Sequence, residues 1–100
     1  MIVNMNDVEP ADHDAGGGQM WKYQGNYFTG MIEEYINGVL RGQIEVQNGR
    51  TEGIIKHFYP NGQIEQEYSL HNNGLHGIFK EWDENGNLIS ETNWVNGVRV

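Results

Sequence analysis

The chain has 100 residues, a formal net charge of −8 and no cysteine. This length supports one domain, and the lack of cysteine excludes disulfides and thiolate metal sites. The negative charge disfavours nucleic acid and anionic membrane surfaces as partners. It fits a basic protein partner, with the alternative that the charge only keeps a sheet with open edges soluble.

The first 18 residues predict a flexible acidic leader. They hold Asp7, Glu9, Asp12 and Asp14, no Lys or Arg, and end in three glycines. Such a composition is typical of disordered segments. The segment lacks the basic and apolar regions of a signal peptide, and no stretch reaches the roughly 18 apolar residues of a membrane span. We therefore expect a leader over residues 1–18, a repeat domain over 19–100 and a cytoplasmic location.

In the rest of the chain the pair Asn-Gly recurs at intervals of 11 to 13 residues. Asn-Gly between apolar runs is a strong signal for a β-hairpin, because a type I′ turn needs positive φ at two successive residues. The regular spacing predicts strand and turn in alternation. The pairs are Asn37-Gly38, Asn48-Gly49, Asn61-Gly62, Asn73-Gly74, Asn85-Gly86 and Asn96-Gly97.

Two turns make one unit of about 24 residues, and three units begin near Gly30, Gly53 and Gly77. Side chains alternate between the faces of a strand. One face therefore carries the apolar ladder Met31, Ile54 and Ile78 with Tyr35, Phe58 and Trp82, and the other mixes Glu34, His57 and Glu81 with Ile32, Ile55 and Phe79. We predict an all-β fold, an elongated antiparallel meander of β-hairpins in a single sheet, with one mainly apolar face and no deep core.

No reaction centre emerges from the residue types present. His71 and His76 flank a turn, and with Glu67 as third ligand they would suggest a metal, but solvated turn histidines explain them better. Glu65 with Glu67, or Glu81 with Asp83, would suggest a glycosidase pair only if a cleft held them at a defined separation. We expect no catalytic residue, no metal and no cofactor, and therefore no enzyme.

The repeated pattern resembles the MORN repeat in its bacterial variant. It comprises Gly, an aromatic residue five positions later, Asn-Gly, an aliphatic residue, Glu, an apolar residue and a second Asn-Gly. The segments that carry it are 53–74 and 77–97, with a looser match over 19–52. The resemblance implies a curved sheet of hairpins without catalytic residues. Proteins similar to this are commonly antitoxin components of bacterial toxin–antitoxin pairs, and eukaryotic relatives are linked to membrane attachment and scaffolding.

Together these features predict a non-catalytic protein-binding module that neutralises a bacterial toxin or effector by masking a basic surface. Strand parity places the expected contact residues at Glu34, His57, Tyr59, Glu65, Glu81 and Asp83. The alternatives are a scaffold that assembles through exposed edge strands and, less favoured by the charge, a scaffold bound to membrane lipid. We expect no nucleic-acid partner.

Overall fold

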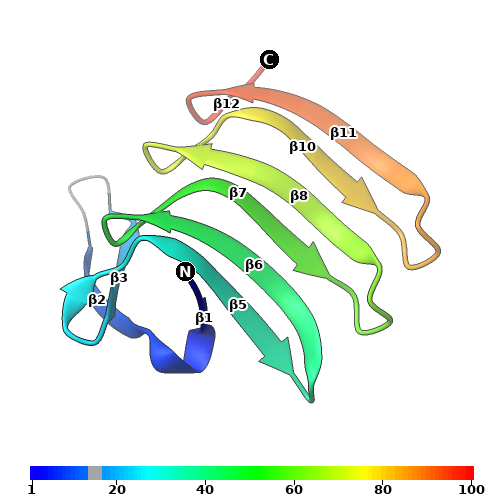
Figure 1. Cartoon of the computed structure of the whole chain (residues 1–100). Helices are drawn as coiled ribbons and strands as arrows, with labels where there is room; N and C mark the ends of the chain where they lie inside the picture. Colours follow the sequence, from blue (N-terminus) through cyan, green and yellow to red (C-terminus); the bar gives the residue numbers. More distant parts are fainter. Residues whose placement is uncertain (14–16) are drawn as a thin grey trace.

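The computed structural model describes residues 1–13 and 17–100, and most of these residues lie in β-strands. Hairpin follows hairpin in one open, curved sheet (Figure 1). In spatial order its main strands are β5 (Gly30–Ile36), β6 (Val39–Gln47), β7 (Arg50–Phe58), β8 (Ile64–His71), β10 (Gly77–Trp82), β11 (Leu88–Val95) and β12 (Val98–Arg99). Each neighbouring pair in this series is antiparallel. The molecule measures 41 × 36 × 18 Å, so it is flattened as a single sheet requires. The predicted antiparallel meander is confirmed.

Type I′ turns close the hairpins at one end of the sheet. Both central residues have positive φ at Asn48-Gly49 (49° and 83°) and at Asn96-Gly97 (50° and 83°), as this turn demands. Between β8 and β9 (Gly74–Leu75) the turn residues are Asn72 and Asn73, so this turn begins one residue earlier than the Asn-Gly pair predicted. Asn can take the place of Gly there because its short polar side chain tolerates the left-handed region.

The turns at the other end are mostly one residue longer. At Asn61-Gly62 and Asn85-Gly86 only the glycine has positive φ (89° and 88°). The amide of Gly62 donates to the carbonyl of Tyr59 at 3.0 Å, and the amide of Gly86 donates to that of Asp83 at 3.1 Å. These loops are type I turns followed by a left-handed glycine. The first unit has one residue fewer before its Asn-Gly, and Asn37-Gly38 accordingly forms the shorter type I′ turn (52° and 78°).

Each unit also contains a β-bulge at the same position. In the second unit His57 pairs with Gln66 and Phe58 with Ile64, which leaves Glu65 as the extra residue. The first and third units repeat this shift beside Tyr35 and Trp82. A bulge bends the strand and increases its twist. Three bulges in register along the sheet therefore account for part of its common curvature.

Paired residues project from the same face, so the register defines two faces. The inner face carries the row Ile32, Ile44, Ile55, Tyr68, Phe79 and Thr92. The outer face carries the row Glu33, Gln43, Lys56, Glu67, Lys80 and Glu91, together with Met31, Ile54 and Ile78.

The face expected to be mixed is the one that packs. On the inner face Ile32 is 0% exposed and Ile55 is 3% exposed, whereas Ile54 and Ile78 on the outer face are 44% and 48% exposed. The face predicted to be mainly apolar, around Met31, Ile54 and Ile78, is therefore the more exposed of the two. The reason is tertiary: another part of the chain covers only the inner face.

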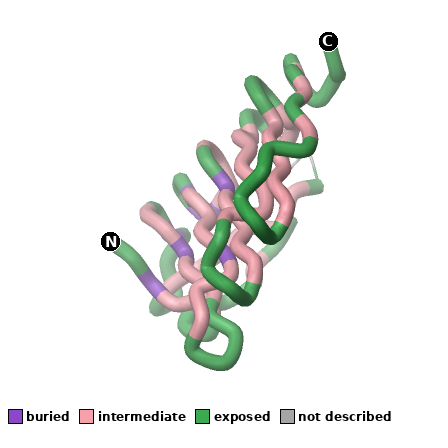
Figure 2. The backbone as a smooth tube through the Cα atoms, turned by 90° about the vertical axis from the view of Figure 1, so that its right-hand side faces the viewer, coloured by how far each residue is buried: buried purple, intermediate pink, exposed green. Residues whose placement is uncertain are grey.

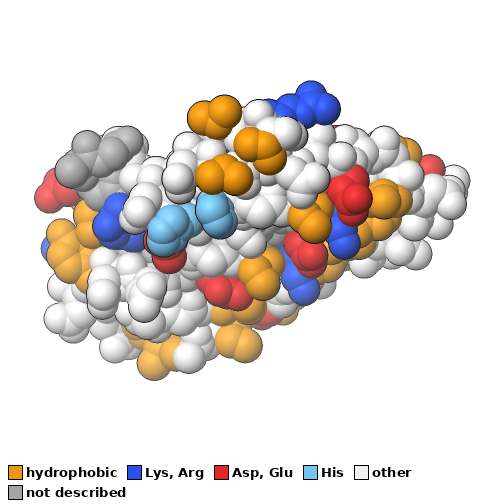
Figure 3. Space-filling view, turned by 90° about the horizontal axis from the view of Figure 1, so that it is seen from above, with side chains coloured by type: hydrophobic (Ala, Val, Ile, Leu, Met, Phe, Trp, Pro, Cys, Tyr) orange, Lys and Arg blue, Asp and Glu red, His pale blue; other side chains and the backbone are white. Residues whose placement is uncertain are grey.

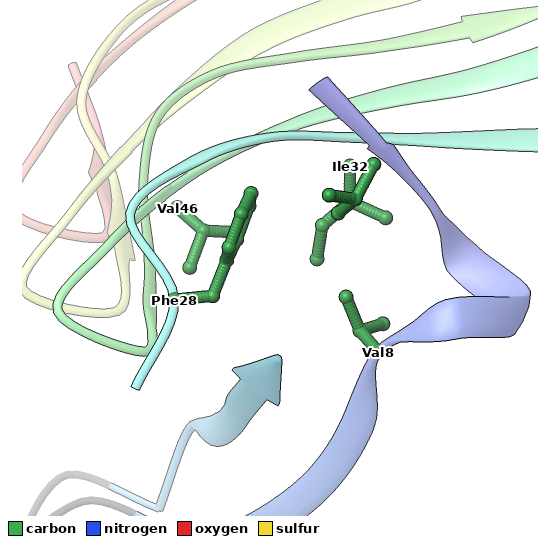
Figure 4. Close-up of a cluster of buried hydrophobic side chains, with 5 residues drawn as sticks. Val8, Phe28, Ile32 and Val46 are labelled. Carbon is green, nitrogen blue, oxygen red and sulfur yellow. The ribbon is translucent and has the colours of Figure 1, made fainter. Parts of the chain in front are cut away.

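That covering part is the N-terminal segment. β1 (Ile2–Asn4) pairs parallel with β5, then η1 (Met5–Asp7) turns the chain back toward β2 (Glu9–His13). β2 pairs with β3 (Gln19–Tyr23), and β3 pairs with β4 (Asn26–Tyr27). Val3 and Val8 form the main buried cluster with Phe28, Ile32 and Val46 (Figure 4).

This packing differs from the predicted leader over residues 1–18. Residues 2–13 form part of the fold, because Val3 and Val8 bury their side chains against the sheet, although Val8 lies between Asp7 and Glu9. Asp14 and Gly16 of the expected leader lie outside the described residues. The buried residues gather toward the N-terminal part of the sheet, and the last hairpin shows none (Figure 2). In the described part of the chain, no helix has the length and apolar character needed to cross a membrane.

Candidate functional site

Three of the residues predicted to contact a partner share one row on the inner face. The row runs Glu34, Gly42, His57, Gln66 and Glu81, each paired with the next across neighbouring strands. Gln66 donates from Nε2 to Oε1 of Glu81 at 3.2 Å. The row therefore places the two carboxylates on either side of His57, with no side chain at Gly42 to separate Glu34 from His57.

Tyr59 lies in the loop after β7 and connects two successive loops. Its hydroxyl donates to the carbonyl of Trp82 at 2.7 Å, and nearby the Asn61 side-chain amide donates to the carbonyl of Glu84 at 2.9 Å. These bonds hold the second-unit and third-unit loops side by side. The carboxylates carried by the two loops and by the strands leading into them are thereby brought together.

Four carboxylates surround the Tyr59 ring. Burial raises the pKa of the Tyr59 hydroxyl, and the negative charges of Glu65, Glu84, Asp83 and Glu81 raise it further, in that order. A neighbouring anion disfavours the charged phenolate, so each of these carboxylates adds to the effect of burial. We call Glu65, Glu81, Asp83 and Glu84 the acidic end.

Asp83 has a structural task within the acidic end. Its Oδ1 accepts from the amides of Asn85 and Asn87 at 2.9 Å each, and its Oδ2 accepts from the Asn87 side chain at 3.2 Å. These bonds, those from Asn87 first, lower the pKa of the Asp83 carboxyl. Asp83 thus stays ionised while it stabilises the turn, and it contributes charge at the surface without having a free oxygen.

The bulge of the first unit carries a cation that contacts the backbone of the neighbouring strand. Arg41 is the extra residue of the first bulge, the position that Glu65 occupies in the second unit. Its Nε donates to the carbonyl of Phe58 at 2.7 Å. Arg41 therefore fixes the neighbouring strand by a backbone contact at the position where the second unit has an acid.

An aromatic stack lies next to the row of polar residues. The Tyr68 and Phe79 rings are parallel within 4° with centroids 4.9 Å apart, and the His57 ring follows at 5.8 Å from Tyr68. Nε2 of His57 lies 3.1 Å from the Tyr68 hydroxyl. Burial raises the pKa of Tyr68. The inner face of the second and third units thus presents an apolar strip bordered by acids.

The histidine pair does not assemble the metal site considered from sequence. His71 and His76 do approach, with ring centroids 5.8 Å apart (Figure 3). However, the carboxylate beside His71 is that of Glu52, at 3.5 Å, while Glu67 lies on the outer face 3.7 Å from Lys56. Within the described residues, no group of three such side chains is arranged to hold a metal ion.

A hollow of about 390 Å³ lies apart from the acidic end. It is lined by the start of β5, the end of β6 and the start of β7, among them Met31, Glu45 and Glu52. None of the six predicted contact residues lines it.

Two residues of the candidate site, Gln66 in the polar row and Glu84 in the acidic end, were not predicted from the sequence. Gln66 could have been found from its place opposite His57 and Glu81, but Glu84 lies in a turn, where strand parity gives no signal.

The hairpins β7–β8 and β10–β11 are the part of the chain that is similar to a known protein family. The family model of the MORN repeat variant matches residues 51–72 and 75–96. Two stretches of the chain are thus similar to this repeat. No curated protein and no solved structure matches the chain. Each MORN match contains one left-handed glycine of the predicted repeat, Gly53 or Gly77, and ends in or beside a type I′ turn. The acidic end is therefore assembled from residues of both matched segments, Glu65 from the first and Glu81, Asp83 and Glu84 from the second.

Proposed function

We propose that this protein is a non-catalytic binding module which neutralises a bacterial toxin or another effector in the cytoplasm by covering a basic surface. The observation that carries the proposal is the acidic end, where four carboxylates from two MORN repeats surround Tyr59. MORN repeats in general are modules that associate with proteins or membrane lipids, and the net charge of −8 favours a basic protein over an anionic membrane.

The chemistry of the acidic end suits arginine and lysine side chains. Carboxylates bind guanidinium groups through paired, charge-assisted hydrogen bonds. Tyr is enriched among the residues that dominate binding energy, because it offers a rigid apolar body with a polar tip. Glu65, Glu81 and Glu84 are partly or fully exposed, so they are available to a partner at little reorganisation cost.

Affinity capture from the source cell tests this proposal with a matched pair of variants. E81Q/E84Q removes two charges from the acidic end, whereas E9Q/E91Q removes two exposed charges elsewhere and leaves the same net charge. We expect a stoichiometric basic partner to bind wild type and E9Q/E91Q, with binding to E81Q/E84Q reduced several-fold and more so at low salt. The captured protein should stop growth when expressed alone and permit growth with this chain. Equal capture by both variants would refute the proposal.

Self-assembly is a second candidate, favoured by one observation. β12 pairs with Trp94 and Val95, and the amide of Val100 donates to the carbonyl of Asn93 at 2.9 Å, so within the described chain Leu88–Thr92 have one edge without a paired strand. Leu88 and Ile89 on this edge are exposed, and open edges template pairing with a second chain. Light scattering that shows a monomer at high concentration would remove this candidate.

A further inference from the structure

The inner face is covered unequally along the repeats. Ile32, Ile55 and Phe79 each lie two residues after the first glycine of their unit. Ile32 and Ile55 are buried, whereas Phe79 is partly exposed. Equivalent positions of the repeat can therefore be compared directly: the side chain is buried in the first unit and partly exposed in the third.

The N-terminal segment shows how little chain is needed to close this face. β1 extends the sheet beside β5, a single 3₁₀ turn follows, and Val3 and Val8 place two aliphatic side chains against Ile32 and its neighbours (Figure 4). The amide of Met31 donates to the carbonyl of Met1 at 3.0 Å, which fixes the start of the segment. Two valines five residues apart thus help to bury this unit, together with Phe28 and with Met5, Trp21 and Tyr23, which pack against the cluster.

The open part of the inner face offers a corresponding surface over β8, β10 and β11. Phe79 stacks on Tyr68 on one side and pairs with Thr92 on the other, and the Trp94 indole donates to the Thr92 hydroxyl at 2.8 Å. We call Tyr68, Phe79, Thr92 and Trp94 the open strip. It is apolar in the middle and borders Glu81 and the acidic end on one side.

We propose that the open strip binds an extended segment of a basic partner protein, with two aliphatic side chains over Phe79 and Trp94 and Lys or Arg side chains against the acidic end. This inference rests on the proposed function and specifies the form of the partner. Charge favours a basic partner segment on the open strip over the N-terminal segment of a second copy of this chain. Residues 1–13 carry Asp7, Glu9 and Asp12 and no Lys or Arg, so the same segment of a second copy would bring carboxylates against Glu81 and its neighbours.

Two synthetic peptides test the proposal against the full-length protein. The first has the sequence of residues 1–13, and the second has the same sequence with Asp7, Glu9 and Asp12 each replaced by Lys. We expect the second peptide to bind at least tenfold more tightly, measured by tryptophan fluorescence titration. Amide chemical shifts should move at Tyr68, Phe79, Thr92 and Trp94. Equal binding of both peptides would indicate that the open strip binds the N-terminal segment of a second copy. Chemical-shift changes confined to Ile32 and Val46 would indicate that the peptide replaces the protein's own N-terminal segment. Either result overturns the proposal.

A pair of neighbouring variants identifies the face. Phe79→Ala removes the centre of the open strip, and Ile78→Ala removes an exposed aliphatic side chain of the outer face one residue away. We expect peptide binding to fall tenfold or more only with Phe79→Ala, and the chemical shifts of wild type give the same information should that variant unfold. Partner capture that depends on Glu81 and Glu84 but not on Phe79 would refute this inference while leaving the proposed function intact. Capture independent of the acidic end would refute the proposed function itself.

Discussion

The first glycine of each repeat provides a test of what holds the N-terminal segment in place. Gly30, Gly53 and Gly77 all have positive φ, at 149°, 103° and 94°. A Cβ built at Gly30 would lie 2.3 Å from the carbonyl oxygen of Met1 and 2.8 Å from Cζ of Phe28. At Gly53 the same atom would lie 2.3 Å from Oε2 of Glu45, and at Gly77 nothing lies within 4 Å. Replacement by Ala therefore separates backbone strain from crowding.

The expected loss of stability differs among the three positions. Gly77→Ala carries only the strain of a left-handed residue, about 1–2 kcal/mol. Gly53→Ala adds a small increment, because the end of the Glu45 side chain can rotate away. Gly30→Ala must displace the Met1 backbone, which forfeits the Met31 hydrogen bond, about 1 kcal/mol, and part of the Val3 burial, roughly 1.5 kcal/mol. We therefore expect a loss of about 4 kcal/mol for Gly30→Ala.

Urea unfolding of the three variants measures these differences, and for a domain of this size each kcal/mol corresponds to about 4–8 °C in melting temperature. A double-mutant cycle with Val8→Ala adds a second criterion. Because Gly30→Ala already loosens the segment, the two losses should be less than additive. If Gly77→Ala proves as costly as Gly30→Ala, or if the cycle is strictly additive, the N-terminal segment is not held as described.

Three further predictions concern single side chains and are each measured by chemical denaturation. Val8→Ala should cost about 2 kcal/mol through lost burial and a residual cavity, and no effect would contradict the packing of the segment. Tyr59→Phe should cost about 1 kcal/mol because the Trp82 carbonyl loses its donor, whereas Tyr35→Phe, whose hydroxyl meets only the exposed side chain of Glu33, should be nearly neutral. Asp83→Asn should remove stability that is present above the usual carboxyl pKa of 3.8 and that wild type loses as the pH falls through the lower folded pKa; an identical acid dependence in both proteins would contradict this.

The hairpin architecture could be predicted because its determinants are local. A type I′ turn needs two left-handed residues in succession, and Asn-Gly supplies them at Asn37-Gly38, Asn48-Gly49 and Asn96-Gly97. The exceptions follow from spacing. One residue more after Gly53 and Gly77 gives longer turns at Asn61-Gly62 and Asn85-Gly86, and Asn72 before Asn73 allows the turn between β8 and β9 to form one position early. The number of residues before each Asn-Gly pair and the Asn72-Asn73 pair can both be read from the sequence.

The identity of the buried face could not be predicted from the repeat. Both faces carry apolar residues at regular positions, and strand parity alone does not say which of them another segment will cover. The decisive residues, Val3 and Val8, lie in a segment whose average composition indicates disorder. The composition of a segment is an average over its residues, whereas the burial of this segment depends on the positions of the Val3 and Val8 side chains.

The alignment of three candidate residues in one row could be predicted, because repetition keeps equivalent residues in line. Glu34, His57 and Glu81 occupy one position of the unit and lie in one row of the sheet. The approach of the two loops that adds Tyr59 and Glu84 depends on hydrogen bonds between residues 23 apart in sequence. Such contacts between consecutive units have no signal in a single sequence.

Compensation of charge is the reason that the proposed function places a basic partner at the acidic end and not on the outer face. The outer row alternates in sign, with Lys56 between Gln43 and Glu67 and Lys80 between Glu67 and Glu91 (Figure 3). Each acid in the middle of that row already has a lysine beside it, as the 3.7 Å contact of Glu67 with Lys56 shows. At the acidic end the neighbouring Arg41 donates to a backbone carbonyl, and the carboxylates around Tyr59 raise its pKa together. The negative potential therefore concentrates where two repeats meet, next to the part of the inner face that the N-terminal segment leaves uncovered.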